Sequence, residues 1–338
     1  MIIDCDRHAA VEKHSELFPY MTESWRRHFE RDEWLSAVVL ATNHVRVTDS
    51  FRHSEPPPFA PGRDPDLASL VVANQGLTVN GWADHVAARI YLEALNSYGR
   101  EHWSGPTSKL AILVSPYDPA WSAGEIRRRA GSGDFGAVAL PLMPEMLGSR
   151  VWDPVYDACV ETGLPLVVHF SGVEGRYLGA PPLSGGVHLS AFSRLALMPH
   201  LAESNISSLT FEGAFARHPQ LQVLFSGFGF IWLPSLLWRL DREWRTFRSD
   251  VPWVTSPPSE QVASNMWFST APVAEAADLQ TWEAGVPEGL RSRIVFGSHA
   301  PYGSDSPADL RRVLGPDWAE RISDNGRALL SPTTNATV

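Results

Sequence analysis

Short apolar runs of strand length recur along the chain, with longer amphipathic segments between them. Near-continuous apolar strands are typical of parallel sheets covered on both faces, and strands that alternate with helices indicate βαβ units. The pattern therefore predicts an α/β protein, a single (β/α)8 barrel over residues 1–330. Seven runs are clear and an eighth is weaker: residues 1–6, 109–115, 136–142, 165–170, 221–226, 265–270 and 294–299, with the weak run at 77–79.

The segment 232–244 shows the helical period most clearly. Apolar side chains recur there every third or fourth residue, namely Trp232, Leu233, Leu236, Leu237, Leu240 and Trp244. Such a stripe is typical of the buried face of an amphipathic helix. We therefore expect this helix to pack against the barrel rather than to hold a cofactor.

Two further segments are not expected to form barrel elements. Residues 52–66 contain Pro56, Pro57, Pro58 and Pro61, and proline fixes φ and removes a backbone donor. This stretch is expected to be a long loop, which is a lid over the site, an arm between subunits or a plain surface excursion. Residues 331–338 are polar and are expected to form a flexible tail.

Composition narrows the classes of partner. The chain has 338 residues, of which 44% are hydrophobic and 20% charged, as in an ordinary globular protein with a large core. Its formal charge of −10 and pI near 5.6 argue against nucleic acid, since phosphate binding needs clustered Lys and Arg. The proline-rich loop and the 13 tryptophans favour a homodimer.

The cysteines and the termini indicate a cytoplasmic location. Cys5 and Cys159 are too few for a disulfide framework, which favours a reducing compartment. Residues 1–4 do not begin a basic segment followed by an apolar run, so nothing resembles a secretory signal. The most apolar stretch, 228–238, is interrupted by Pro234 and is far short of the roughly 20 residues that span a membrane.

Candidate chemistry lies at the ends of three predicted strands. Asp6 and His8 are two residues apart and project to one side of the first strand, while His169 and His299 end two later strands. Because the carboxyl ends of barrel strands share one face, these four side chains are expected to meet and bind one divalent metal. Carboxylate and imidazole ligands favour zinc, with manganese or iron as alternatives and a metal-free site also open.

Each of these histidines also has a purely structural interpretation. A lone histidine in a polar barrel mouth more often bonds a backbone carbonyl, but three of them beside a carboxylate favour a metal site. The other histidines fall in predicted loops or helices where nothing converges, and they are expected to be solvated or to cap helices. They include His53, His85, His188, His200 and His218.

Six segments, in this order, carry a family resemblance: residues 4–8, 164–170, 217–221, 232–244, 296–298 and 322–325. With them the chain resembles the amidohydrolase-related family (amidohydrolase 2), which includes aminocarboxymuconate semialdehyde decarboxylase and the resorcylate decarboxylases. The resemblance implies a (β/α)8 barrel with one divalent metal. It places the ligands in a D-x-H or H-x-H pair on the first strand, a histidine after the fifth and an aspartate after the eighth. Asp6, His8 and His169 match this pattern.

The chain departs from the family at two places. Relatives usually read Phe-Gly-Ser-Asp-Tyr-Pro-His after the last strand, whereas residues 296–302 read Phe-Gly-Ser-His-Ala-Pro-Tyr, so His299 stands where the aspartate is expected. Relatives often place a glutamate or histidine after the sixth strand, and residues 225–229 contain neither. A neutral imidazole at position 299 makes the site more positive by one charge than the family's aspartate would. The groups that usually transfer protons in the family are therefore missing at both places.

Three functions follow from these residues. The first is a metal-dependent, non-redox decarboxylase or hydrolase of a small carboxylated or carbonyl substrate, with Ser298 and Tyr302 as nearby hydrogen-bonding groups and His299 also catalytic. The second is a metal-independent cyclase, isomerase or dehydratase that uses Asp6, His299 and Tyr302. The third is a barrel that has lost catalysis and serves in binding or assembly.

Overall fold

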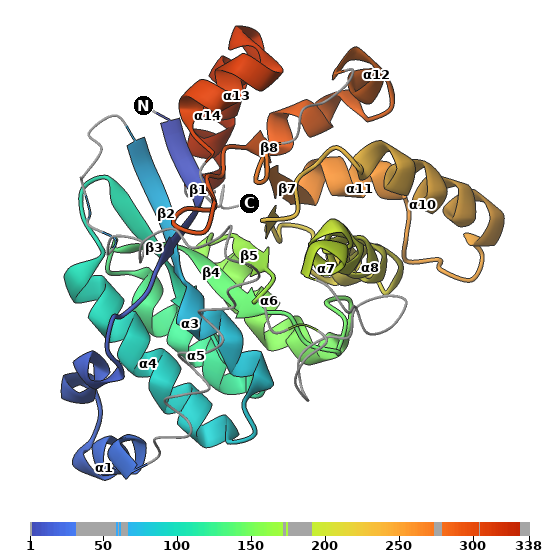
Figure 1. Ribbon diagram of the computed structural model, residues 1–338. Coiled ribbons are helices and arrows are strands. Elements are labelled where there is room, and N and C mark those ends of the chain that lie inside the picture. Colours follow the sequence, from blue (N-terminus) through green and yellow to red (C-terminus); the bar gives the residue numbers. More distant parts are fainter. Residues whose placement is uncertain are drawn as a thin grey trace.

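The computed structural model describes residues 2–31, 59, 61, 67–171, 174, 191–273, 279–303 and 305–331. Eight strands form one parallel sheet in which each strand pairs with the next along the chain (Figure 1). They are β1 (Ile2–Ala9), β2 (Leu67–Ala73), β3 (Ser108–Leu113), β4 (Phe135–Pro141), β5 (Leu166–His169), β6 (Val223–Ser226), β7 (Met266–Ser269) and β8 (Ile294–Val295). The predicted (β/α)8 barrel is confirmed.

Helices connect the strands and lie outside the sheet in Figure 1. The longer ones are α1 (Glu23–Arg31), α4 (His85–His102), α5 (Pro119–Ala130), α6 (Asp153–Thr162), α8 (Pro199–Phe211), α10 (Leu233–Phe247), α11 (Pro258–Asn265), α13 (Pro307–Leu314) and α14 (Pro316–Leu330). Short α-helices are α3 (Asn74–Leu77), α7 (Ala191–Ala196), α9 (Ala214–Arg217) and α12 (Leu279–Ala284). Short 3-10 helices are η1 (His14–Tyr20), η3 (Thr78–Gly81), η4 (Arg150–Trp152) and η5 (Glu288–Arg293).

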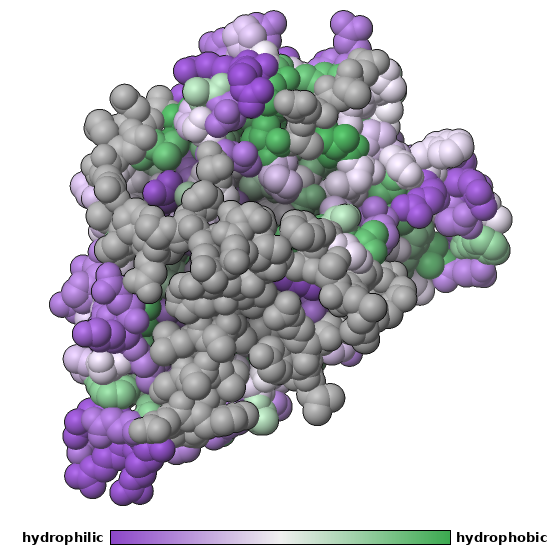
Figure 2. Space-filling model, in the orientation of Figure 1, coloured by the Kyte–Doolittle hydropathy of each residue, from purple (hydrophilic) through white to green (hydrophobic). Residues whose placement is uncertain are grey.

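The strands are buried on both faces. Every residue of β5, β6 and β7 is buried, which explains why their sequences are nearly continuous apolar runs rather than alternating ones. The polar surface lies on the outer helices, as Figure 2 shows for α1 at the lower left, where Arg26 and Arg27 pair with Glu23. No helix in the described ranges is both long and apolar enough to cross a membrane.

The expected strand at 77–79 is wrong. The second strand is β2, and Leu77 and Val79 lie instead in α3 and η3, the helical turns that follow it. Both side chains are fully buried, so they are apolar because they belong to the core and not because they form a strand. A run of three apolar residues cannot distinguish the two by periodicity.

The helix predicted at 232–244 is confirmed as α10. Leu233, Leu236, Leu237 and Leu240 form its buried face. The proline-rich loop at 52–66 and the tail at 331–338 lie almost wholly outside the described residues, which include only positions 59, 61 and 331 of them.

The first and last strands meet at a seam that closes the barrel (Figure 1). Because β8 has only two residues, single hydrogen bonds from β1 join it to the segment that follows β8. The Cys5 amide donates to the Phe296 carbonyl at 2.8 Å, and the His8 amide donates to the Ala300 carbonyl at 2.8 Å. The seam therefore brings the carboxyl end of β1 beside residues 296–300.

Candidate metal centre

The four predicted ligands lie together at the carboxyl end of the strands. One ligand atom from each of Asp6, His8, His169 and His299 lies within 4.8 Å of the others. Asp6 Oδ1 is 3.2 Å from His8 Nε2 and 3.4 Å from His169 Nε2. Asp6 Oδ2 is 3.7 Å from His299 Nδ1. Such convergence of one carboxylate and three imidazoles suits a divalent transition metal.

The cluster contains buried polar atoms without hydrogen-bond partners. Asp6 and His8 are each 1% exposed, and among the described residues neither the Asp6 oxygens nor the His8 nitrogens have a partner in a hydrogen bond of acceptable geometry. An unpaired buried carboxylate costs several kcal/mol. A cation among these atoms would satisfy them all, so the residues present fit a bound metal.

The tautomer of His169 also fits a metal ligand. Its Nδ1 lies within hydrogen-bonding distance of the Phe170 carbonyl, which can only accept, so the proton is assigned to Nδ1. That leaves the Nε2 lone pair directed at the cluster, 3.3 Å from His299 Nδ1. Burial lowers the pKa of His169 to about 3, against the opposing effect of Asp6, so the ring is neutral at pH 7.

The carboxylate in the cluster is ionised. Burial alone would raise the pKa of Asp6, but His169, His299 and His8 around it hold that pKa well below its usual range. An anionic carboxylate is the protonation state that metal coordination requires of Asp6.

Ser298 does not have a free hydroxyl. Its Oγ donates to Asp4 Oδ2 at 2.6 Å and accepts from the Ala300 amide at 3.0 Å. Asp4 is fully buried two residues before Asp6. The strand pattern puts Asp4 on the same side as Asp6 but indicates no role for it, and its partner 294 residues away carries no local signal.

Tyr302 lies beside the cluster at the barrel mouth. Its ring centroid is 5.8 Å from that of His8 and 6.0 Å from that of His299. The residue is 37% exposed, and its hydroxyl accepts a hydrogen bond from Asn74 Nδ2 at 3.2 Å. Burial of the ring raises the pKa of Tyr302, so the phenol remains protonated at neutral pH.

Aromatic side chains that the sequence analysis did not single out flank the imidazoles. The Phe170 ring centroid lies 4.4 Å from that of His169 and 5.6 Å from that of His299. Phe228 meets Phe170 edge to face at 5.7 Å. This side of the site is therefore apolar.

The residue after β6 has no side chain because no room exists for one. Gly227 has a φ of +83°, and a β-carbon there would lie 2.5 Å from His169 Nε2. The missing acid or base after the sixth strand thus coincides with a close approach of the backbone to the cluster.

Of the other histidines, His218 is not solvated but is the C-cap residue of α9, in line with the capping half of the expectation. It is buried, with Nε2 3.0 Å from Asp153 Oδ1 and Nδ1 3.2 Å from Asp157 Oδ1. His85 is exposed and stacks on Tyr117 with ring centroids 3.6 Å apart. His53 and His188 lie outside the described residues.

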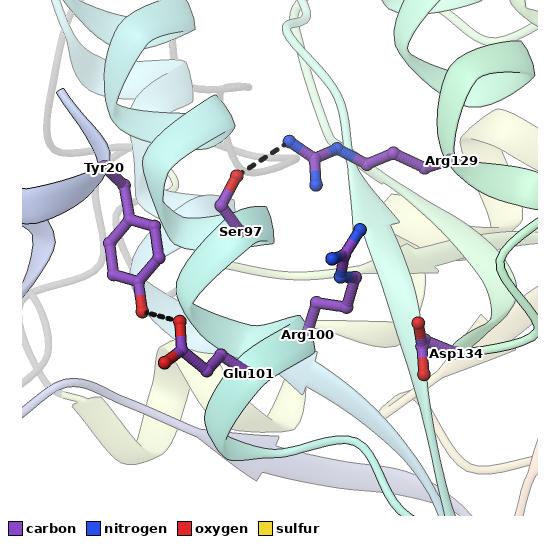
Figure 3. A pocket seen from close by; sticks show the side chains of 6 residues that line it. All are labelled: Tyr20, Ser97, Arg100, Glu101, Arg129 and Asp134. Carbon is purple, nitrogen blue, oxygen red and sulfur yellow. Dashed lines mark hydrogen bonds between the residues drawn. The ribbon is translucent and has the colours of Figure 1, made fainter. Parts of the chain in front are cut away.

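A hollow of about 540 Å³ lies away from the cluster (Figure 3). Asp134 on its rim directly precedes β4, so the hollow is at the amino end of the strands, opposite the face where barrel enzymes hold their sites. In Figure 3 Arg129 donates to Ser97 and Tyr20 to Glu101 across it. Its lining consists of Tyr20, Ser97, Arg100, Glu101, Arg129 and Asp134.

Comparison with protein families accounts for nearly the whole chain. The sequence model of the family described as Amidohydrolase matches residues 3–322. The chain belongs to this amidohydrolase family. The family match spans all eight strands and all four residues of the cluster. Among curated proteins no match was found.

Solved structures share the fold at low identity. An amidohydrolase from Mycobacterium avium subsp. paratuberculosis is 23% identical with a TM-score of 0.62, over 78% of this chain and 70% of that one. The 5-carboxyvanillate decarboxylase of Novosphingobium aromaticivorans, complexed with manganese, is 18% identical with a TM-score of 0.68, over 98% and 96% of the two chains. A dihydroxybenzoic acid decarboxylase from Polaromonas sp. with bound manganese is 15% identical with a TM-score of 0.63, over 98% and 97%.

Proposed function

We propose that this amidohydrolase-family protein is a metal-dependent, non-redox enzyme that decarboxylates a small aromatic or otherwise planar carboxylic acid. The observation that carries the proposal is the group of buried, unpaired Asp6 and His8 atoms that converge with His169 and His299. These four residues would hold one divalent ion. Hydrolysis of a small carboxylated or carbonyl substrate is the alternative reaction for the same metal-dependent site.

The ligand set determines the charge of the site. A bound divalent metal supplies a Lewis acid that polarises a substrate oxygen. Asp6 contributes the single negative charge among the ligands, because the imidazoles are neutral donors. The occupied centre would therefore carry a net positive charge in a largely buried position, which favours an anionic substrate such as a carboxylate.

His299 is the most exposed residue of the proposed metal centre. Its side chain is 22% exposed, whereas those of Asp6, His8 and His169 are each at most 1% exposed. A ligand in the barrel mouth would thus reach His299 before it reaches the other three. Decarboxylation replaces a carboxylate by a proton on the same carbon, so a protonated group must lie beside the bound substrate. Tyr302 would hydrogen-bond the substrate beside it.

The aromatic wall supports a planar substrate. The apolar ring of Phe170 is partly exposed and lies next to His169 and His299, where an aromatic ring could pack against it. The two decarboxylases described above hold manganese. Manganese is therefore proposed as an alternative to zinc, the metal that the ligand types favour. The homodimer and the cytoplasmic location stay predictions.

Metal analysis and turnover together test the proposal. Purified protein should contain about one divalent metal per chain, and Mn²⁺ or Zn²⁺ added to chelated protein should restore CO₂ release from one or more hydroxybenzoates. His169→Ala should lose both metal and activity. His85→Ala, which changes an exposed histidine outside the cluster, should keep both. Activity that survives complete chelation would contradict the proposal.

A further inference from the structure

Asp4 is a fully buried carboxylate two residues before Asp6, and Arg7 Nη1 lies 3.8 Å from its Oδ2. Its Oδ1 accepts hydrogen bonds from the Asp6 amide at 3.1 Å and the Ser298 amide at 3.0 Å. Its Oδ2 accepts the Ser298 hydroxyl at 2.6 Å. Together these three donors satisfy both oxygens of the buried carboxylate.

These bonds reach the backbone on both sides of His299. Ser298 precedes it, and the Ser298 hydroxyl also accepts from the Ala300 amide at 3.0 Å. His299 itself has a φ of +54°, a left-handed conformation that costs a residue with a β-carbon about 1 kcal/mol or more. Such a conformation persists only where neighbouring contacts fix it, and Ser298 and Ala300 supply them.

The same carboxylate also holds β1. The Asp6 amide that donates to Asp4 belongs to a proposed metal ligand, in the stretch where the pairing of β1 with β2 shifts register between Asp4 and Arg7. One side chain thus fixes the backbone of Asp6 and of the residue before His299. These two ligands approach the cluster from opposite sides of the seam.

We propose that Asp4 and Ser298, here called the seam clamp, are positioning residues that set the geometry of Asp6 and His299 for metal binding. The inference rests on the proposed metal centre. Outer groups that orient ligands typically contribute 10- to 100-fold to metal affinity. Ser298, predicted from sequence as a group near the substrate, acts here through Asp4 and His299.

Three variants separate this role from general stability. Asp4→Asn keeps the shape but replaces one accepting oxygen by an amide donor, which cannot accept from the Ser298 amide or hydroxyl. Ser298→Ala removes the hydroxyl that donates to Asp4 and accepts from the Ala300 amide. Ser298→Thr restores a hydroxyl. We expect D4N and S298A to weaken Mn²⁺ binding about 10- to 100-fold, and S298T to recover most of that loss.

The chain offers a matched control for the same chemistry. Asp241 accepts from the Ser259 amide at 2.9 Å and the Ser259 hydroxyl at 2.8 Å, between α10 and α11. Asp241→Asn and Ser259→Ala should lower the melting temperature as the clamp variants do but leave the Mn²⁺ dissociation constant unchanged. The readouts are Mn²⁺ titration and the electron paramagnetic resonance spectrum of the bound ion, which reports ligand geometry without any need for turnover.

The outcomes distinguish the inference from the function on which it rests. Wild-type protein that binds neither Mn²⁺ nor Zn²⁺ would overturn the metal centre and the clamp together. Wild-type binding with equal affinity and an unchanged spectrum in S298A would overturn the clamp alone. If D4N does not fold, S298A and S298T decide, because both retain the Asp4 carboxylate. Weaker binding and an altered spectrum in S298A, with recovery in S298T, support the inference.

Discussion

Gly227 approaches His169 so closely that a β-carbon at position 227 would lie 2.5 Å from the Nε2 nitrogen that faces the cluster. The distance is shorter than any tolerable contact between those atoms. Either the imidazole or the strand end would have to move. The absence of a side chain at this position is therefore a condition for the proposed metal centre.

Gly227→Ala should weaken metal binding by at least about tenfold, because it displaces the imidazole of His169. The change also adds the penalty of a β-carbon at positive φ, about 1 kcal/mol. Gly133→Ala is the matched control, since its φ is +76° and nothing lies within 4 Å of a β-carbon there. Titration with Mn²⁺ should show unchanged affinity in the control. Equal affinity in both variants would refute the steric argument.

His299→Asp should keep the metal and weaken anion binding. The substitution adds one negative charge to the cluster, and aspartate tolerates the left-handed backbone at φ +54° better than most residues. A unit charge at close range in a partly buried site changes binding by a few kcal/mol, which predicts at least a tenfold higher inhibition constant for benzoate. His299→Ala serves as the uncharged comparison. The difference should shrink at high salt, and a salt-independent result would count against the charge argument.

Removal of the metal should destabilise the wild-type protein. A ligand at 100 times its dissociation constant stabilises the folded state by about 2.7 kcal/mol, so chelation should lower the melting temperature by several degrees. Asp6→Asn should lose most of this stabilisation by metal, because the variant lacks the anionic member of the proposed ligand set. Scanning fluorimetry with and without chelator should show a smaller shift in melting temperature for the variant than for the wild type. An equal shift in both proteins would contradict the assignment of Asp6 as a metal ligand.

A buried histidine outside the cluster should make stability depend on pH. His14 stacks on Tyr91 at 5.4 Å, and neither ring nitrogen has a hydrogen-bond partner within the described part of the chain. Burial lowers the pKa of His14 below its ordinary value of 6.5. The unfolded chain therefore binds this proton first, and the free energy of unfolding falls as pH drops below 6.5, by at most about 1.4 kcal/mol per pH unit until the native pKa is reached.

His14→Phe should remove this fall in the free energy of unfolding at low pH. Urea unfolding at pH 7.5 and pH 5.5 should then show a smaller difference for the variant than for the wild type. His85→Phe is the control, because His85 is exposed and should leave the difference unchanged. An identical pH dependence in H14F and wild type would show that His14 is not the group responsible.

The sequence predicted the barrel and the ligand cluster because both depend on local signals. Near-continuous apolar runs marked seven strands, and the chemistry of their final residues, such as His169, marked one face of the sheet. The second strand was missed because the apolar residues Leu77 and Val79, which are buried in helical turns, imitate a short strand. Three apolar residues in a row fit a buried helical turn as well as a strand, so the sequence pattern alone cannot distinguish the two.

The surroundings of the cluster could not be predicted, because they depend on contacts between distant parts of the chain. The bond from Ser298 to Asp4 joins residues 294 positions apart, and nothing near either residue marks it. The close approach of Gly227 to His169 likewise depends on how β5 and β6 pack. The left-handed backbone of His299 has no sequence signal, since glycine or asparagine would ordinarily mark such a position.

The seam also has a consequence for synthesis of the protein. β1 is synthesised before β8, yet His299, which completes the proposed metal centre, follows β8. Nearly the entire chain must therefore be made before the cluster can form. A nascent or truncated polypeptide would carry Asp6, His8 and His169 but would lack His299. Ion capture would thus come at the end of folding and would report that the last strand has docked.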